Sequence, residues 1–396
     1  MSTAAETIIA PSPDLKNRIS AGTAIDRRAD VDDKQTAVAR LLRSVDCDGL
    51  LVLEPENFAW LTSGATARGV LEGQDRPALY YSSEQRWVLA SNVDSQRLFD
   101  EEIDGLGFQL KEWPWHWRRE QLLADLYQGR KVACDVAYRD CPLVADQLRE
   151  LRCVLSEYEQ ACMRAVGHVL SHALEATCRT MALHLTEREI AGQVSHRLLH
   201  RGAQPVEISV AADGRSAIYR QFGFTDVPVR RHAVLMATAR KYGLCATASR
   251  SVSFGPPEPG FRQQHDAVGK ILATYIASSW PDAGPREILA LGRRVYLITG
   301  FEHEWLTCPQ GHITGRLPVE SILTPQTNEL FKGGWPVSWR ASAGAAISCD
   351  TFIITERGPE CVTVPETWPL QRIRVQGADF LRPFIYERPR EGAENA

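Results

Sequence analysis

The stretch HAVLMATARKYGLCATASRSVSFG, residues 232–255, decides the fold of the second half of this chain. It contains two runs rich in apolar and small residues, 233–239 and 244–255, with Gly243 in the short segment between them. Runs of this kind around a glycine-containing turn predict two consecutive strands. Another such run, VEISVAA at 206–212, precedes them. We therefore expect strands to dominate from residue 206 onward.

Two long amphipathic helices are predicted just before these strands, at 156–182 and 185–203. Ser156 and Thr186 are each followed three residues later by a glutamate, which is the spacing of a capping box. The later elements are expected in this order: helices near 261–279 and 285–298, then strands within 336–355. This change of pattern predicts a second domain, with a boundary near residues 152–156.

The first half of the chain alternates short helix and strand patterns. An amphipathic run at 32–45 precedes the apolar strand GLLVL at 49–53, and the alternation continues to about residue 151. This predicts an α/β domain with a partly parallel sheet. We therefore expect four segments, namely a flexible N-terminal tail at 1–30, an α/β domain at 31–153, an α+β domain at 154–380 and a C-terminal tail at 381–396.

Composition limits the classes of function. The 396 residues carry 49 acidic and 45 basic side chains, a net charge of −4, which argues against a binder of nucleic acid. No run approaches the length of a membrane span, and the N-terminus lacks the pattern of a secretory signal. The ten cysteines form no CxxC pair, as expected for reduced thiols. We expect a cytoplasmic protein with no membrane contact.

Common cofactor and nucleophile motifs are absent. The sequence has no GxGxxG, no GxxxxGK[ST] and no GxSxG. Histidines at i, i+4 occur twice, as His168 with His172 and His196 with His200, a spacing that suits a metal but more often serves packing. Alternate indoles at 113, 115 and 117 would line one face of an extended strand, either as an interface or as core.

The second half resembles the pita-bread metallopeptidase family, which includes methionine aminopeptidase, aminopeptidase P, prolidase and creatinase. In the 232–255 block the match rests on Gly243, Arg250 and Gly255. Later blocks, QGHITGRLPVE at 310–320 and two runs within 336–355, follow in the family's order. The first half is similar to the creatinase/prolidase N-terminal domain. The resemblance implies an α/β N-terminal domain followed by an α+β pita-bread domain.

The family binds two divalent metals through two Asp, one His and two Glu, and the resemblance places those ligands on mostly different residues here. They fall on Ala237 (or Met236 if the loop shifts by one), Thr247, His312, Arg340 and Cys349. Only His312 is a retained ligand. The family's substrate-contacting histidines fall on Gln221 and on Val319, which is beside Glu320. Two divalent ions need several anionic oxygens, so we expect no metal and no cofactor.

Three functions follow from this departure. The first is a catalytically degenerate member that binds a small molecule or a partner and forms a homodimer, with Arg340, Arg250, Thr247, Gln221 and Ala237 as candidate ligand-binding residues. The second is a metal-independent C–N bond hydrolase of the creatinase or ectoine hydrolase kind, using His312 with Cys349 or Glu320. The third, least favoured, is an Xaa-Pro peptidase. Because Arg340 would repel a cation, an anionic or neutral ligand is expected.

Cys349 and His312 could act together, since the resemblance places both at one metal. A histidine beside a cysteine is a known nucleophilic arrangement. The alternative is a buried cysteine that fills the volume of the lost glutamate, which is the commoner role of a free cysteine. Asp350 follows Cys349 in the same strand and is expected to point to the opposite face.

Overall fold

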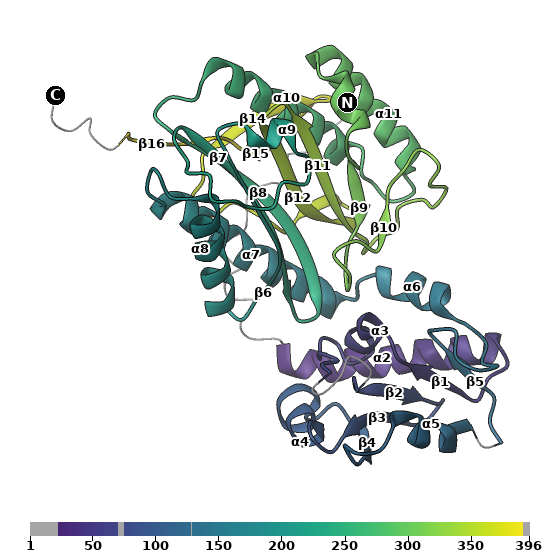
Figure 1. The fold of residues 1–396 in the computed structure, drawn as a ribbon. Coiled ribbons are helices and arrows are strands. Elements are labelled where there is room, and N and C mark those ends of the chain that lie inside the picture. The colour runs from purple at the N-terminus through teal and green to yellow at the C-terminus, as the bar shows by residue number, and fades with distance from the viewer. Residues whose placement is uncertain (1–22, 70–74, 128, 391–396) are drawn as a thin grey trace. The chain divides into compact units, whose positions relative to one another are not determined.

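A computed structural model describes residues 23–69, 75–127 and 129–390. These residues form two compact units, one of residues 23–159 with 242–244 and one of residues 160–241 with 245–390 (Figure 1). None of the helices within the described ranges is long and apolar enough to cross a membrane.

The N-terminal unit is built on a five-stranded mixed sheet. The strands, in spatial order, are β4 (Gln109–Trp113), β3 (Arg86–Ser91), β2 (Ala78–Tyr81), β1 (Gly49–Val52) and β5 (Val132–Cys134). Strands β1 and β5 are parallel, as are β3 and β4, whereas β2 is antiparallel to both of its neighbours. The helical segments are α2 (Thr23–Ser44), α3 (Pro55–Leu61), α4 (Ser95–Arg97), η1 (Leu98–Ile103), α5 (Arg119–Tyr127) and α6 (Ala145–Cys153).

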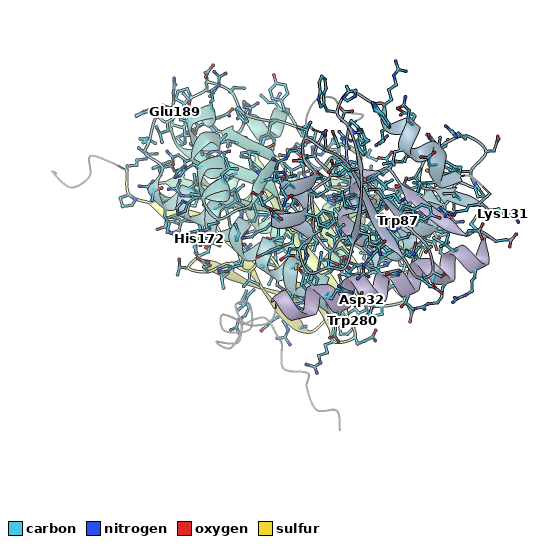
Figure 2. All side chains as sticks on the ribbon, turned by 90° about the horizontal axis from the view of Figure 1, so that it is seen from below. Asp32, Trp87, Lys131, His172, Glu189 and Trp280 are labelled. Atoms are coloured by element: carbon cyan, nitrogen blue, oxygen red, sulfur yellow. The ribbon has the colours of Figure 1, made fainter. Side chains whose placement is uncertain are left out.

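Both faces of this sheet are buried. Leu50 and Val52 of β1 pack into one hydrophobic cluster and Leu51 into another, because successive strand side chains point to opposite faces. On the second face, Trp87 of β3, labelled in Figure 2, stacks on Tyr80 of β2. Their ring centroids lie 5.1 Å apart. The predicted α/β domain with a partly parallel sheet is confirmed.

The first described helix begins earlier than the sequence predicts. Residues 23–30, assigned above to a flexible tail, belong to α2, while residues 1–22 lie outside the described range. The buried Lys34 explains the extension, since its Nζ donates to Asp30 Oδ2 at 2.6 Å and to Glu159 Oε1 at 2.8 Å. A buried ammonium needs such paired carboxylates, so the turn that carries Asp30 is held in the helix.

The C-terminal unit contains two larger sheets and a hairpin. One sheet has the order β16 (Tyr386–Arg388), β8 (Leu244–Phe254), β7 (His232–Lys241), β6 (Gln204–Ala212). The other has the order β10 (Ser321–Ile322), β9 (Gly311–Ile313), β11 (Pro336–Ala343), β12 (Ala346–Thr355), β13 (Gly358–Cys361). The hairpin pairs β14 (Leu370–Val375) with β15 (Ala378–Pro383). The predicted strands of this half are therefore present.

Helices cover these sheets. They are α7 (Glu157–Thr180), α8 (Glu187–His200), α9 (Arg215–Ile218), α10 (Pro259–Ala277), α11 (Pro285–Thr299) and the 3-10 turn η2 (Glu302–Leu306). Helix α8 packs on β6, and α10 packs on β11 and β12 (Figure 1). Both predicted capping boxes form, at Ser156 with Glu159 and at Thr186 with Glu189.

The C-terminal segment is ordered further than expected. Residues 381–390 were predicted to be a tail, yet they complete β15 and form β16, which pairs in parallel with β8. The backbone N–H of Gly255 donates to the Arg388 carbonyl at 2.7 Å, so β16 satisfies the edge of β8. Arg382 is also buried, in an ion pair with Asp350. Residues 391–396 lie outside the described range.

Candidate functional site

Strand register in the second sheet places three predicted site residues on one face. His312 of β9 lies opposite Ser338 of β11, and Ser338 lies opposite Thr351 of β12. Two residues further along β11, Arg340 lies opposite Cys349. Directly opposed residues of antiparallel strands share a face, as do residues two apart. These five side chains therefore form one polar face across β9, β11 and β12.

The other sheet contributes a row of hydroxyl groups. Thr238 of β7 lies opposite Glu207 of β6, and its Oγ1 is 2.8 Å from Thr247 Oγ1 of β8. The two sheets meet here, because Thr351 Oγ1 accepts from the Thr247 N–H and donates to its carbonyl, both at 2.9 Å. Similarly, the Cys349 N–H donates to Ser249 Oγ at 2.8 Å. We call the surface formed by these two sets of side chains the His312 face. Its members are His312, Ser338, Arg340, Cys349 and Thr351 from one sheet, and Thr238, Thr247 and Ser249 from the other.

Four of the five predicted ligand positions lie on this face, and the fifth needs a correction. Ala237 precedes Thr238 in β7, so its side chain points away from Thr247 and cannot contribute. Met236, the position reached by a one-residue shift, shares the face of Thr238 instead. Alternation along β7 therefore favours the second of the two predicted positions for the first Asp, Met236, over Ala237.

The residues present do not fit two divalent metals. Within the described ranges, no group of three or more His, Cys, Asp and Glu side chains is placed to hold an ion. Met236 and Thr247 supply no anionic oxygen, and Arg340 adds a positive charge. Paired hard cations need carboxylates to offset their charge and lost hydration. No step of two-metal chemistry can be derived from this donor set.

His312 is a neutral base on this face. Burial and the charge of Arg340 lower the pKa of His312 to about 4, against a smaller opposing effect of a hydrogen bond to the Pro318 backbone. Proline has only a carbonyl to offer, so a ring N–H donates to it. Nε2 has no partner and is buried, so Nδ1 carries that proton. Nε2 is therefore left as an unused acceptor.

Cys349 does not form the predicted pair with His312. Strand β11 separates β9 from β12, and the two residues lie opposite different β11 residues, Ser338 and Arg340. Since His312 Nε2 has no partner, the sulfur does not bond to it. Burial raises the pKa of Cys349 to about 12, so its reactive thiolate is suppressed. The geometry therefore contradicts the dyad and matches the buried-cysteine alternative.

Arg340 is charged but not paired. Its Nη2 donates to the backbone carbonyl of Arg220, and its Nε is buried without a partner. It forms no ion pair with any residue in the described ranges. The neighbouring Arg220 differs, because it pairs with Glu304 at 2.6 Å. Arg340 is thus a partly exposed guanidinium whose counter-charge is not supplied by these residues.

Two other predicted residues lie in loops around the face. Glu320 Oε1 accepts from the Leu317 N–H at 3.1 Å, so this carboxylate helps to close the loop that also holds Pro318. Gln221 is exposed in the loop that follows α9. Its neighbour Arg220 is tied to Arg340, which places this loop at the edge of the His312 face.

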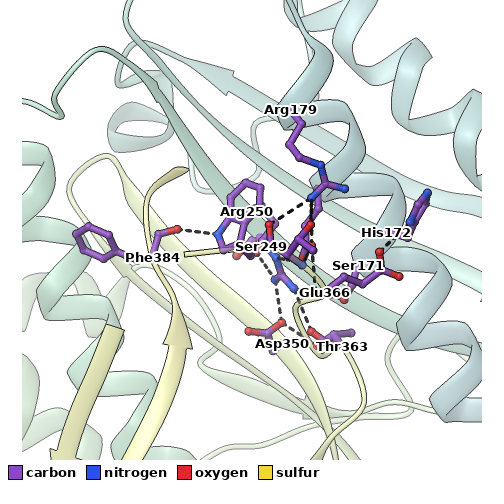
Figure 3. A network of polar contacts seen from close by, with 12 residues as sticks. Ser171, His172, Arg179, Ser249, Arg250, Asp350, Thr363, Glu366 and Phe384 are labelled. Atoms are coloured by element: carbon purple, nitrogen blue, oxygen red, sulfur yellow. Dashed lines mark hydrogen bonds and ion pairs between the residues drawn. The ribbon is translucent and has the colours of Figure 1, made fainter. Parts of the chain in front are cut away.

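Arg250 is not a ligand-binding residue on this face, contrary to the prediction. It is fully buried on the opposite side of β8 from Ser249, with ion pairs of 3.2 Å to Glu175 and to Asp350 (Figure 3). Thr363 Oγ1 donates to the same Asp350 oxygen at 2.7 Å. As predicted, Asp350 points to the opposite face of β12 from Cys349, and this places its buried carboxylate in the network of Arg250. Arg250 therefore ties α7, β8 and β12 together.

Apart from Thr247, the sequence analysis did not single out the hydroxyl groups of the face. Their pattern is visible in β8, where Thr247, Ser249, Ser251 and Ser253 alternate with other residues and are all buried. A buried strand with a hydroxyl at every second position presents one polar face. Ser251 Oγ, like Ser209 Oγ of β6, has no hydrogen-bond partner.

The two histidine pairs lie outside this face. His168 and His172 both contact Glu366, at 3.3 and 3.0 Å, on the surface of α7 (Figures 2 and 3). His196 and His200 are exposed, and their rings stack at 6.2 Å. Neither pair belongs to a group placed to hold a metal within the described residues.

The three indoles do not share a face. Trp113 ends β4 and is buried, whereas Trp115 and Trp117 lie in the following turn and are 62% and 52% exposed. Pro114 explains the break, since proline cannot donate a ladder hydrogen bond. One indole is therefore core, and two are surface.

Comparisons with known proteins agree with this architecture. Residues 161–333 match the family model described as metallopeptidase family M24. No curated protein sequence matches the chain. A prolidase from Pyrococcus horikoshii OT3 has a TM-score of 0.72 at 16% identity, covering 84% of this chain and 99% of its own. An X-Pro aminopeptidase from Thermotoga maritima MSB8 has a TM-score of 0.71 at 16% identity, covering 88% and 100%.

A similar fold also occurs in a subunit of a larger complex. The N-terminal domain of SPT16, a subunit of the FACT complex from Cicer arietinum, has a TM-score of 0.63 at 12% identity, covering 86% of this chain and 96% of its own. At such identities the likeness concerns the fold, and fold alone does not carry activity. The resemblance to the pita-bread metallopeptidase family is thereby confirmed, and the chain has that family's architecture, a creatinase/prolidase-type α/β domain followed by an α+β pita-bread domain.

Proposed function

We propose that this chain is a metal-free pita-bread protein that binds a ligand on the His312 face instead of hydrolysing peptides. The donor set carries the proposal, because Met236, Thr247, Arg340 and Cys349 occupy positions where the family has carboxylates. Of the five positions, only His312 and a thiolate of Cys349 could bind a divalent ion, and burial raises the pKa of Cys349 to about 12, which disfavours the thiolate. A positive guanidinium among them opposes metal binding by electrostatic repulsion.

Metal content and peptidase activity of the purified chain test the proposal. We expect substoichiometric divalent metal by mass spectrometry and no cleavage of Xaa-Pro dipeptides, with or without added Mn²⁺ or Co²⁺. Stoichiometric metal together with Xaa-Pro cleavage that is lost in His312→Ala would refute it.

A restoration variant provides the matched control. Met236→Asp, Thr247→Asp, Arg340→Glu and Cys349→Glu together return carboxylates to the four altered positions. We expect this variant to gain affinity for Mn²⁺ relative to the unaltered chain, measured by calorimetry, because four anionic groups would then face His312. Equal Mn²⁺ binding by both proteins would show that these positions do not control metal binding.

A second candidate is metal-independent hydrolysis of a C–N bond. It is supported by His312 Nε2, a neutral acceptor without a partner, which is the form a general base requires. Creatine and ectoine are suitable probes, because the resemblance includes enzymes of those kinds. Product release by the chain that His312→Gln abolishes would favour this candidate, and no product with either probe would remove its support.

We also propose that the chain is a cytoplasmic homodimer. All ten cysteines are free, which suits a reducing compartment. The exposed Trp115 and Trp117 supply aromatic surface of the kind enriched at interfaces. Light scattering should give twice the chain mass, and Trp115→Ser with Trp117→Ser should reduce it. A monomeric mass for the unaltered chain would contradict the dimer.

A further inference from the structure

We propose that the His312 face binds a small carboxylate whose neighbouring carbon carries a hydroxyl group, with Arg340 holding the carboxylate and His312 accepting from the hydroxyl. This inference rests on the proposed function, since it names the class of ligand that the metal-free face would take.

The charge of Arg340 has no carboxylate partner among the described residues. Other arginines of this unit have carboxylate partners, for example Glu304 for the part-buried Arg220, and both Glu175 and Asp350 for the buried Arg250. Arg340 is bound only to a backbone carbonyl, and its Nε is buried without a partner. Partly removing a guanidinium from water without a counter-charge is costly. An anionic ligand would offset that cost, and the planar fork suits a carboxylate.

The surroundings of Arg340 favour an oxyanion. The hydroxyl groups of Thr238 and Thr247 line the face and bond to each other, which leaves one of their two hydrogens to donate to an anionic oxygen. The hydroxyl of Ser338 is already used, because it donates to Thr351 Oγ1, whose own hydrogen goes to the Thr247 carbonyl. Glu207 of β6 lies opposite Thr238 of β7. Its side chain is exposed and forms no ion pair with Arg340. The face therefore offers positive charge and a donor, while the carboxylates noted near it lie at its edge, Glu207 exposed and Glu320 bonded to the Leu317 N–H.

His312 favours a ligand that carries a hydrogen-bond donor. Its Nε2 accepts from no residue, while the other ring nitrogen is used by the Pro318 carbonyl. His312 and Arg340 are diagonal neighbours across β9 and β11, a relation that spaces residues by about 7–8 Å or less. Both residues retain some exposed surface, whereas Nε2 of His312 and Nε of Arg340 are themselves buried, so the ligand has to displace water below the surface to reach them. A hydroxyl on the carbon next to the carboxylate satisfies both groups at once.

The test compares glycolate with acetate, which lacks the hydroxyl. We expect the chain to bind glycolate more tightly than acetate in calorimetric titrations at constant ionic strength in chloride. Arg340→Gln should weaken the binding of both by about tenfold or more, as for loss of a charged hydrogen bond. His312→Phe should remove the preference for glycolate and keep acetate binding. Arg357→Gln, at an exposed arginine in the β12–β13 turn, should bind as the unaltered chain does.

Several results would overturn the inference. They are no binding of either acid, glycolate binding that survives Arg340→Gln, a glycolate preference that survives His312→Phe, or tighter binding of inorganic phosphate than of glycolate. Arg340→Lys, which retains the charge, guards against misfolding, since glycolate affinity should fall between that of the unaltered chain and that of Arg340→Gln. Stoichiometric metal would instead refute the proposed function, so the two failures are distinguishable.

Discussion

Arg250 shows how much a single buried residue can hold in place. Its guanidinium lies between Glu175 of α7 and Asp350 of β12, and none of these three side chains is more than 1% exposed. Because the partners come from distant parts of the chain, the ion pairs join a helix to two sheets. Their role is architectural, on the side of β8 away from the His312 face.

Removing the charge of Arg250 should destabilise the chain strongly. Arg250→Met leaves Glu175 and Asp350 buried with fewer partners, which typically costs about 3–5 kcal/mol. Urea unfolding followed by circular dichroism measures the loss. Arg357→Met, at an exposed position, should change the stability by less than about 0.5 kcal/mol. A similarly small change for Arg250→Met would contradict an architectural role.

His265 should make stability depend on pH. It is buried in α10, and burial lowers its pKa to about 4, against about 6.5 when unfolded. Between these values the unfolded chain binds more protons, so stability falls as the pH drops from about 6.5 towards 4. One such histidine costs ~2 kcal/mol between pH 7 and pH 5.

The variant His265→Phe isolates this effect. Phenylalanine can pack near Phe384, whose ring centre lies 5.3 Å from that of His265. The loss of stability between pH 7 and pH 5, measured by urea unfolding, should be smaller in the variant by ~2 kcal/mol. His232 and His312, whose pKa values burial also lowers, act equally in both proteins. Identical pH profiles would show that His265 does not titrate as inferred.

At the scale of elements, the short strand β16 completes the sheet that carries Thr247. It pairs with residues 252–254 of β8 and protects an edge that would otherwise be open. Tyr386 of this strand also stacks on Trp368, with ring centroids 5.0 Å apart. These contacts explain why the C-terminal segment is ordered where the sequence predicts a tail.

Deleting β16 should lower the melting temperature. Truncation after Ile385 removes the strand pairing and the aromatic stack, for which we expect a loss of about 2–4 kcal/mol. The single change Tyr386→Ala should give a smaller loss, because it removes the stack and keeps the backbone pairing. Calorimetry of the three proteins compares them. A truncated chain as stable as the full chain would contradict the role assigned to β16.

Strand register also decided which site predictions held. Alternation along β7 and β8 was visible in the sequence, yet assigning Ala237 or Met236 to the face required the pairing of Thr238 with Thr247. Likewise, the resemblance placed Cys349 and His312 at one site. In the structure, however, β11 lies between the strands that carry them, so the two side chains do not form a pair. Alternation gives each strand two faces, but only pairing between distant segments shows which face meets which.

For the whole molecule, the proposed function implies a pita-bread fold that does not depend on bound metal. A fold that depended on two bound metals would be stabilised by metal through mass action. We expect the melting temperature of this chain to be the same in EDTA and in excess MnCl₂, because Met236, Thr247 and Arg340 stand in place of carboxylates. A rise in MnCl₂ that EDTA reverses would contradict this expectation.

The sequence by itself determined the fold class and both capping boxes, because helix caps, strand alternation and motif spacing are local properties. Only the tertiary structure decided that Arg250 faces away from the site, that Cys349 is separated from His312, and that Arg340 has no counter-charge among the described residues. It also decided that residues 23–30 and 381–390 are ordered. These outcomes depend on contacts between segments far apart in the chain, whose register and burial no local pattern specifies.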